Sequence, residues 1–176
     1  MVAKPVLSVL MPLLQDCLRS GTKAHEDGLT VSIERGKDEE IYFFHIDCDE
    51  GSRCLGMNKT EKEKCCDYLV FYAKEKSINE VFCFLELKGK NVQRAMLQVI
   101  SAYTYVLALL RKKPGQIQLQ DPVWSVYICL SGSVPQENKK VQKELKKRFG
   151  EGRVSIKAVV EKDTTEFPRF LRKLGQ

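Results

Sequence analysis

The sequence lacks an apolar run of membrane-spanning length, a glycine-rich phosphate loop and a Gly-x-Ser-x-Gly nucleophile motif. These absences argue against a membrane span, nucleotide hydrolysis at a phosphate loop and a serine triad of the hydrolase type. The sequence has only two histidines, His25 and His45. Neither has a recognisable catalytic partner in the sequence. Internal repeats and low-complexity linkers are absent too. We therefore expect one domain over residues 1–176.

We expect the apolar start of the chain to be a helix and not a secretion signal. The apolar start, residues 5–14, precedes Cys17, but Gln15 and Asp16 are not the small residues that a signal peptidase accepts. Apolar residues from Val6 to Leu18 instead recur at helical spacing, which predicts a helix packed on a core. Seven cysteines, an odd number, favour reduced thiols over a disulfide framework. We expect a soluble, cytoplasmic protein with no membrane partner.

Charge and composition suit a globular protein with a polyanionic partner. The 176 residues are 43% hydrophobic and 30% charged, enough for one buried core. Lysine and arginine total 29 against 23 acidic residues, which gives a net charge of +6. Such a balance is compatible with nucleic-acid binding and is also common among proteins that bind none.

The hydrophobic pattern predicts an α/β fold with a mixed sheet flanked by helices. After the first helix, residues 29–35 and 41–47 alternate as strands joined by a hairpin turn, and a polar, irregular segment leads to a strand at 67–73. Residues 80–87 are apolar on both faces, which predicts a central strand. A helix of about twenty residues follows Gly89, and the apolar run 124–130 completes a parallel crossover. The expected core order is α-β-β-β-β-α-β, extended by a basic helix to Phe149, a strand at 154–160 and a short helix at 165–174.

Three charged residues meet in this pattern. Glu86 and Lys88 end the central strand and point to one face, because side chains two apart on a strand share a face. Leu85 and Leu87 point to the other face. Asp67 begins the neighbouring strand, so its carboxylate can close on the same edge. Two carboxylates in a partly buried place require a cation, and hard oxygen ligands select Mg²⁺ or Mn²⁺.

Asp67, the run Glu86-Leu87-Lys88 and the helix that follows resemble the PD-(D/E)xK nuclease superfamily, which has the restriction-endonuclease-like fold. The resemblance covers residues 5–130. It implies a metal-dependent nuclease with Asp67, Glu86 and the main-chain carbonyl of Leu87 as metal ligands. Lys88 would orient the attacking water or stabilise charge on phosphorus. Gln98 on the following helix is a further expected participant.

Many members of that superfamily carry another acidic residue on the first helix or the first strand. Asp16, Glu26 and Glu34 are the candidates here, and we favour Glu34. The expected substrate is nucleic acid, with DNA favoured over RNA. A homodimer, or one subunit of a larger defence or repair complex, is compatible with the small size.

Basic residues near the proposed site predict contacts with nucleic acid. Lys90 and Asn91 directly follow the central strand, and Arg94 lies one turn into the next helix. The helix after Pro135 is strongly basic, and its Lys139, Lys140 and Lys143 are expected to contact phosphates. Such a helix is more often merely a solvated surface.

Two other interpretations stay open. Cys48, Cys54 and Cys65 could supply a zinc site, but they lack paired Cys-x-x-Cys spacing, so we favour free thiols. Glu-x-Lys on a strand is also common as an ordinary surface pair of an α/β scaffold. A nuclease-fold protein that binds nucleic acid or a protein without cutting is the main alternative, although the presence of all three charged residues favours catalysis.

Overall fold

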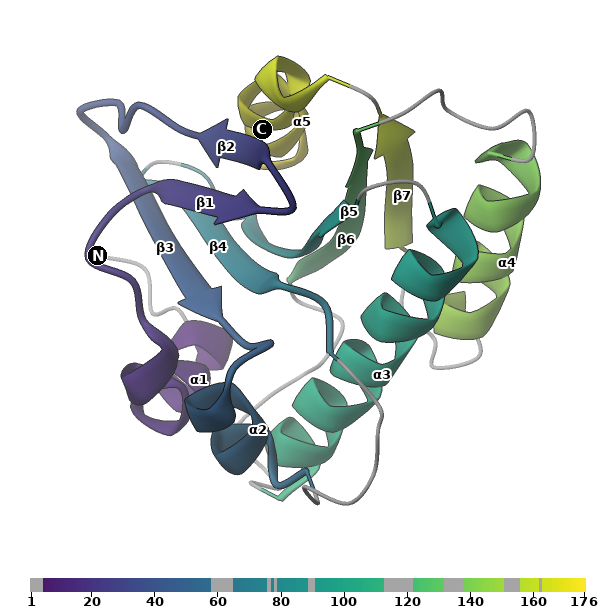
Figure 1. Cartoon of the computed structure of the whole chain (residues 1–176). Helices are drawn as coiled ribbons and strands as arrows, with labels where there is room; N and C mark the ends of the chain where they lie inside the picture. The colour runs from purple at the N-terminus through teal and green to yellow at the C-terminus, as the bar shows by residue number, and fades with distance from the viewer. Residues whose placement is uncertain are drawn as a thin grey trace.

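A computed structural model places the strands in two sheets with helices on both sides (Figure 1). It describes residues 5–57, 65–75, 77, 79–88, 91–112, 122–131, 138–150, 156–161 and 163–176. Within them the helices are α1 (Pro5–Leu13), η1 (Gln15–Cys17), α2 (Asp49–Leu55), α3 (Val92–Arg111), α4 (Asn138–Gly150), η2 (Thr164–Glu166) and α5 (Phe167–Leu174). The strands are β1 (Lys23–Glu26), β2 (Leu29–Ser32), β3 (Glu39–His45), β4 (Tyr68–Lys74), β5 (Glu80–Lys88), β6 (Val123–Leu130) and β7 (Ile156–Glu161).

The main sheet is mixed and has the strand order β3-β4-β5-β6-β7. The first three strands pair antiparallel, and β5, β6 and β7 pair parallel. Helix α3 connects β5 to β6 and α4 connects β6 to β7, as parallel neighbours require. This confirms the predicted crossover and the central position of β5. The α/β class is likewise confirmed.

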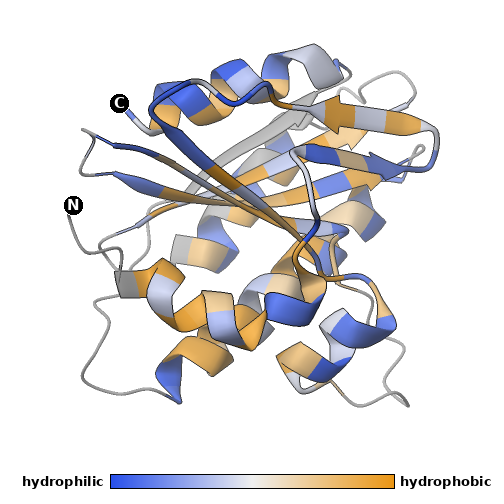
Figure 2. Ribbon diagram, turned by 90° about the vertical axis from the view of Figure 1, so that its left-hand side faces the viewer, coloured by the Kyte–Doolittle hydropathy of each residue, from blue (hydrophilic) through white to orange (hydrophobic). Residues whose placement is uncertain are grey.

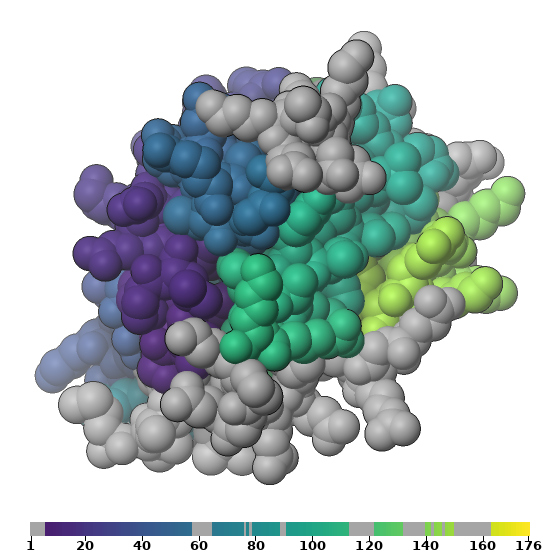
Figure 3. All heavy atoms as spheres, turned by 90° about the horizontal axis from the view of Figure 1, so that it is seen from below, coloured from purple at the N-terminus to yellow at the C-terminus, as the bar shows by residue number. Residues whose placement is uncertain are grey.

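Two separate hydrophobic cores cover the two faces of the main sheet. One face packs against α1, α3 and α4 around Phe82, Phe84 and Trp124. The other face packs against the β1–β2 hairpin and α5, around Leu85 and Leu87. Figure 2 shows apolar residues concentrated on the strands and on the sides of helices that meet them. Seen from below, α1, α2, α3 and α4 form one continuous helical layer (Figure 3).

The predicted buried stripe of α3 is confirmed. Its members Val92, Ala95, Met96, Val99, Tyr103, Val106, Leu107 and Leu110 are all buried. The helix is fixed at its start by Asn91, whose Oδ1 accepts the Arg94 N–H at 2.9 Å. Among the described residues, none of the helices combines the length and the apolarity needed to cross a bilayer.

Two predictions about the first half of the chain are wrong. The expected hairpin between residues 29–35 and 41–47 does not form, because β2 pairs with β1 and β3 pairs with β4. The polar segment after Asp49, expected to be irregular, begins with helix α2. The thiol of Cys48 caps α2 by accepting the Gly51 N–H at 3.2 Å, and Gly56 ends it at a φ of 71°.

Candidate active site

The candidate site lies where β4 begins and β5 ends. Tyr68 stands opposite Leu85 in the antiparallel ladder, so Asp67 and Glu86 are the next opposed pair. Leu85 and Leu87 belong to the core on the α5 side. Glu86 alternates with them and therefore points to the α3 side. The strand geometry thus brings Asp67 and Glu86 together, as the sequence predicted.

Each of the two carboxylates is held by a main-chain N–H of the opposite strand. The Leu87 N–H donates to Asp67 Oδ2 at 2.7 Å, and the Asp67 N–H donates to Glu86 Oε2 at 3.2 Å. These reciprocal hydrogen bonds fix both side chains without the help of a third side chain. Because each bond is made to the main chain of the opposite strand, the strand pairing itself sets the positions of the two side chains.

Lys88 completes the predicted set of three. Its Nζ lies 3.4 Å from Glu86 Oε1, and its side chain is only 17% exposed. Glu86 Oε1 is buried, and apart from this ion pair it has no hydrogen-bond partner in the described part of the chain.

Burial dominates the electrostatics of the pair. Asp67 is 3% exposed and Glu86 is fully buried. Desolvation, then the negative charge of Asp67, raises the pKa of Glu86 to about 8, although Lys88 counteracts the rise. Desolvation likewise raises the pKa of Asp67 to about 7, against the lowering effects of the Leu87 N–H and Lys88. Without an added cation, the two carboxyl groups resist being ionised together.

The donor set fits a hard divalent cation. Asp67 and Glu86 offer buried carboxylate oxygens, and a positive ion would remove the penalty of ionising both. Leu87, whose carbonyl is the third predicted ligand, lies between Glu86 and Lys88. Among the residues that the structure describes, no three His, Cys, Asp or Glu side chains gather as a metal cluster. A cation here would therefore depend on two carboxylates together with main-chain or water oxygens.

Gln98 lies beside the site but contacts it indirectly. Its Nε2 donates to the carbonyl of Cys65 at 3.1 Å, two residues before Asp67. The other amide atom, Oε1, is buried without a hydrogen-bond partner within the described ranges. Gln98 thus positions the segment that leads into Asp67.

The structure does not bring Glu34 to the candidate site. Glu34 is exposed, and its carbonyl accepts a hydrogen bond from Arg172 Nη2 at 2.8 Å. Arg172 also binds Glu39, which pairs with Lys74 at the far end of β4 from Asp67. Glu34 therefore lies at the opposite end of the sheet. The prediction took Glu34 as an acid on the first strand, but the strand before it, β2, belongs to the separate two-stranded sheet.

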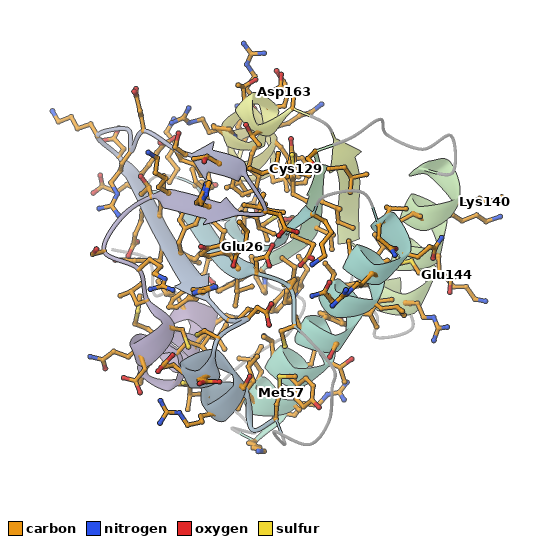
Figure 4. All side chains as sticks on the ribbon, viewed as in Figure 1. Glu26, Met57, Cys129, Lys140, Glu144 and Asp163 are labelled. Atoms are coloured by element: carbon orange, nitrogen blue, oxygen red, sulfur yellow. The ribbon has the colours of Figure 1, made fainter. Side chains whose placement is uncertain are left out.

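The acids near Asp67 are Glu26 and Asp47 instead. Both raise the pKa of Asp67 through their negative charge, after the larger effect of burial. The main-chain N–H of Asp47 also donates to the Asp67 carbonyl at 3.5 Å. Figure 4 shows Glu26 near the centre of the view, at the tip of the β1–β2 hairpin. Its Oε1 lies 3.8 Å from His45 Nε2.

The Glu39–Arg172 pair at the other end gives a prediction for stability. Arg172 binds both carboxylate oxygens of Glu39, at 2.7 and 2.9 Å, which with other hydrogen bonds lowers the Glu39 pKa to about 2. Since a lowered pKa contributes stability above the usual value of 4.5, Arg172→Ala should cost about 1–2 kcal/mol at pH 7. The cost should shrink as the pH falls from about 4.5 to 2. Urea unfolding measures both effects.

Arg169→Ala is the matched control, because Arg169 pairs with Glu166 on an exposed part of the same helix. We expect a change within about 0.5 kcal/mol for that variant. Equal losses for the two arginine variants would contradict the assignment of Arg172 as the stabilising partner.

The predicted zinc ligands do not converge. Cys48 caps α2, and the Cys65 thiol contacts the sulfur of Met57 at 3.2 Å. All seven cysteines are reduced thiols, and the described residues hold no three-residue ligand cluster that would include Cys54. The structure thus gives the zinc interpretation no support.

The predicted nucleic-acid contacts divide into three groups. Asn91 caps α3, so its side chain has a structural role, and Arg94 next to it is exposed. Lys140 and Lys143 are exposed on α4. Lys90 and the side chain of Lys139 lie outside the described residues.

Comparisons with models of protein families, with curated proteins and with solved structures found no match. The interpretation of the site therefore depends on its own geometry and chemistry.

Proposed function

We propose that this protein is a metal-dependent nuclease of restriction-endonuclease-like fold that hydrolyses phosphodiester bonds in nucleic acid, with DNA the favoured substrate. The observation that carries the proposal is the buried pair Asp67 and Glu86. Each carboxyl group accepts a main-chain hydrogen bond from the opposite strand, and Lys88 forms an ion pair with Glu86. An ordinary surface ion pair would be solvated, whereas Glu86 is fully buried. Burying two carboxylates and an ammonium together is costly, so the arrangement needs a functional reason.

The residues divide the chemistry among them. Asp67 and Glu86 would hold Mg²⁺ or Mn²⁺, which when bound polarises the scissile phosphate and makes water a better nucleophile. Lys88 is a partly buried donor beside Glu86, where it can orient the attacking water and stabilise negative charge on the phosphoryl oxygens. Gln98 positions the segment before Asp67 through the Cys65 carbonyl.

Cleavage of a mixed substrate panel tests the proposal. Single- and double-stranded DNA and RNA are incubated with the wild type in Mg²⁺, in Mn²⁺ and in EDTA, beside Asp67→Asn as the matched inactive variant. We expect cleavage of at least one substrate that requires the divalent ion and is lost in the variant. Activity that persists in EDTA or in Asp67→Asn would refute the assignment. Metal-independent binding without any cleavage would indicate a non-cutting nucleic-acid binder.

A further inference from the structure

Helices α3 and α4 pack side by side on one face of the sheet, and a groove of about 550 Å³ lies between them. Met96 and Val141 are buried and form its apolar part. Its remaining lining residues are polar: Gln93, Lys140, Lys143, Glu144 and Lys147. The adjoining surfaces of the two helices appear in Figure 3, and Figure 4 labels Lys140 and Glu144 on α4.

The groove carries a net positive charge. Lys140, Lys143 and Lys147 are exposed, and they recur on one face of α4 at intervals of three and four residues. In the described part of the chain, none of the three forms an ion pair. The charge of Glu144 is offset, because its Oε1 accepts from Arg148 Nε at 3.0 Å. Neighbouring ammonium groups along such a face start about 5–6 Å apart at Cβ, a regular spacing that suits a repeating polyanion.

The groove starts close to the candidate active site. Strands β5 and β6 run parallel and end at the same edge of the sheet, and α3 and α4 follow them in the chain (Figure 1). Gln93 in the groove is five residues after Lys88, so their Cα atoms are at most about 18 Å apart. A nucleic-acid strand with one phosphate per roughly 3.4 Å of rise spans that separation within a few nucleotides.

We infer that the α3–α4 groove holds the sugar–phosphate backbone of the nucleic acid a few nucleotides from the scissile bond. This inference rests on the proposed function and adds the path of the substrate to it. Three lysines that contact phosphates supply affinity with no sequence preference, so the groove acts on all sequences alike. A backbone-binding role for the groove also explains why a basic helix lies beside the candidate site. The site consists mainly of acidic residues, and without nearby positive charge these residues would repel a polyanion.

Binding and cleavage by a triple variant test the inference. Lys140→Ala/Lys143→Ala/Lys147→Ala is compared with Lys23→Ala/Lys37→Ala/Lys173→Ala, which removes three exposed lysines from outside the groove. Fluorescence anisotropy with labelled 30-nucleotide DNA and RNA, in EDTA and at 50–200 mM salt, measures affinity. We expect the groove variant to bind at least about tenfold more weakly at low salt, and its salt slope to fall by about 2–3. The control variant should change much less.

A small substrate separates this inference from the proposed function. Bis(p-nitrophenyl) phosphate is too short to reach the groove, so the groove variant should hydrolyse it in Mn²⁺ at the wild-type rate while cleaving oligonucleotides more slowly. Equal binding by the groove and control variants would contradict the inference that the groove binds the nucleic-acid backbone, and it would leave the nuclease proposal intact. A wild type that binds through these lysines but cleaves neither substrate would support the groove and refute the nuclease.

Discussion

Glu86→Gln should strongly reduce cleavage and at the same time stabilise the metal-free protein above pH 7. Removing one carboxylate takes away half of the side-chain ligands, so we expect cleavage to fall by about 10²–10³-fold. The amide keeps an oxygen to accept the Asp67 N–H, so the strand ends should remain in place. Because Glu86 is fully buried beside Asp67, its negative charge disfavours the folded state when no cation is bound. The variant carries no such charge.

Cleavage of the best substrate in Mn²⁺ and thermal unfolding in EDTA at pH 8 measure the two effects. Glu34→Gln is the matched control, because Glu34 is exposed at the far end of the sheet and should change neither quantity. If Glu86→Gln lost activity and also unfolded more readily in EDTA, Glu86 would be a structural residue. Retained activity would show that Glu86 is not a metal ligand required for cleavage.

The central crossover could be predicted from sequence because its signals are local and strong. Strand β5 is apolar on both faces, as a parallel strand covered on both sides must be. Helix α3 keeps its apolar period over twenty residues. Asp67, Glu86 and Lys88 stand at the ends of these elements, so their convergence followed once the strands were placed. Alternation alone could not show that Glu86 faces a covered side of the sheet.

The β1–β2 hairpin was missed although the sequence contains its signal. Asp27 and Gly28 both have positive φ, 47° and 76°, as the two central residues of a type I′ turn require. Asp-Gly between alternating residues is a strong short-range hairpin signal, and it would have placed Glu26 near a turn. The alternation of residues 29–35 predicted a strand correctly, but alternation does not identify the partner strand.

Helix α2 was missed for a different reason. It has only seven residues, and Leu55 is the only large aliphatic one among them. Its capping residue is Cys48, whereas Ser, Thr, Asp and Asn are the usual signals of a helix start. A helix this short takes its stability from tertiary contacts, here with η1. Sequence periodicity contains no information on such contacts.

The stability of the wild type in EDTA should fall as the pH rises from 7 to 8.5, and a divalent ion should reverse the fall. The pKa values of Asp67 and Glu86 are raised to about 7 and about 8, from 3.8 and 4.5. The folded state therefore keeps protons that the unfolded chain has already released. The resulting stability is present below about pH 4 and is lost as the pH rises through the folded values. We expect a total effect of a few kcal/mol.

Other titrating groups lie outside this window or are removed by comparison with a variant that keeps them. The second case includes Cys17, Cys48, Cys66 and Cys83, whose pKa values are raised mainly by burial, so that stability starts to fall as the pH approaches 9. His45 has a lowered pKa, mainly because of burial. Its titration therefore changes the stability only at pH values below about 6.5. The lowered pKa of Glu39 acts only in acid. Asp67→Asn/Glu86→Gln keeps all of these groups, so the difference between this variant and the wild type isolates the carboxylate pair.

Chemical unfolding at pH 7, 7.5, 8 and 8.5, in EDTA and in Mn²⁺, checks the sign and the reversal. At about 100 times its dissociation constant, Mn²⁺ should add about 2.7 kcal/mol to the wild type. The double variant should have a flatter pH profile and a negligible response to Mn²⁺. If the wild type and the double variant lost stability in parallel, Asp67 and Glu86 would be ordinary ionised acids, and the need for a cation between them would disappear.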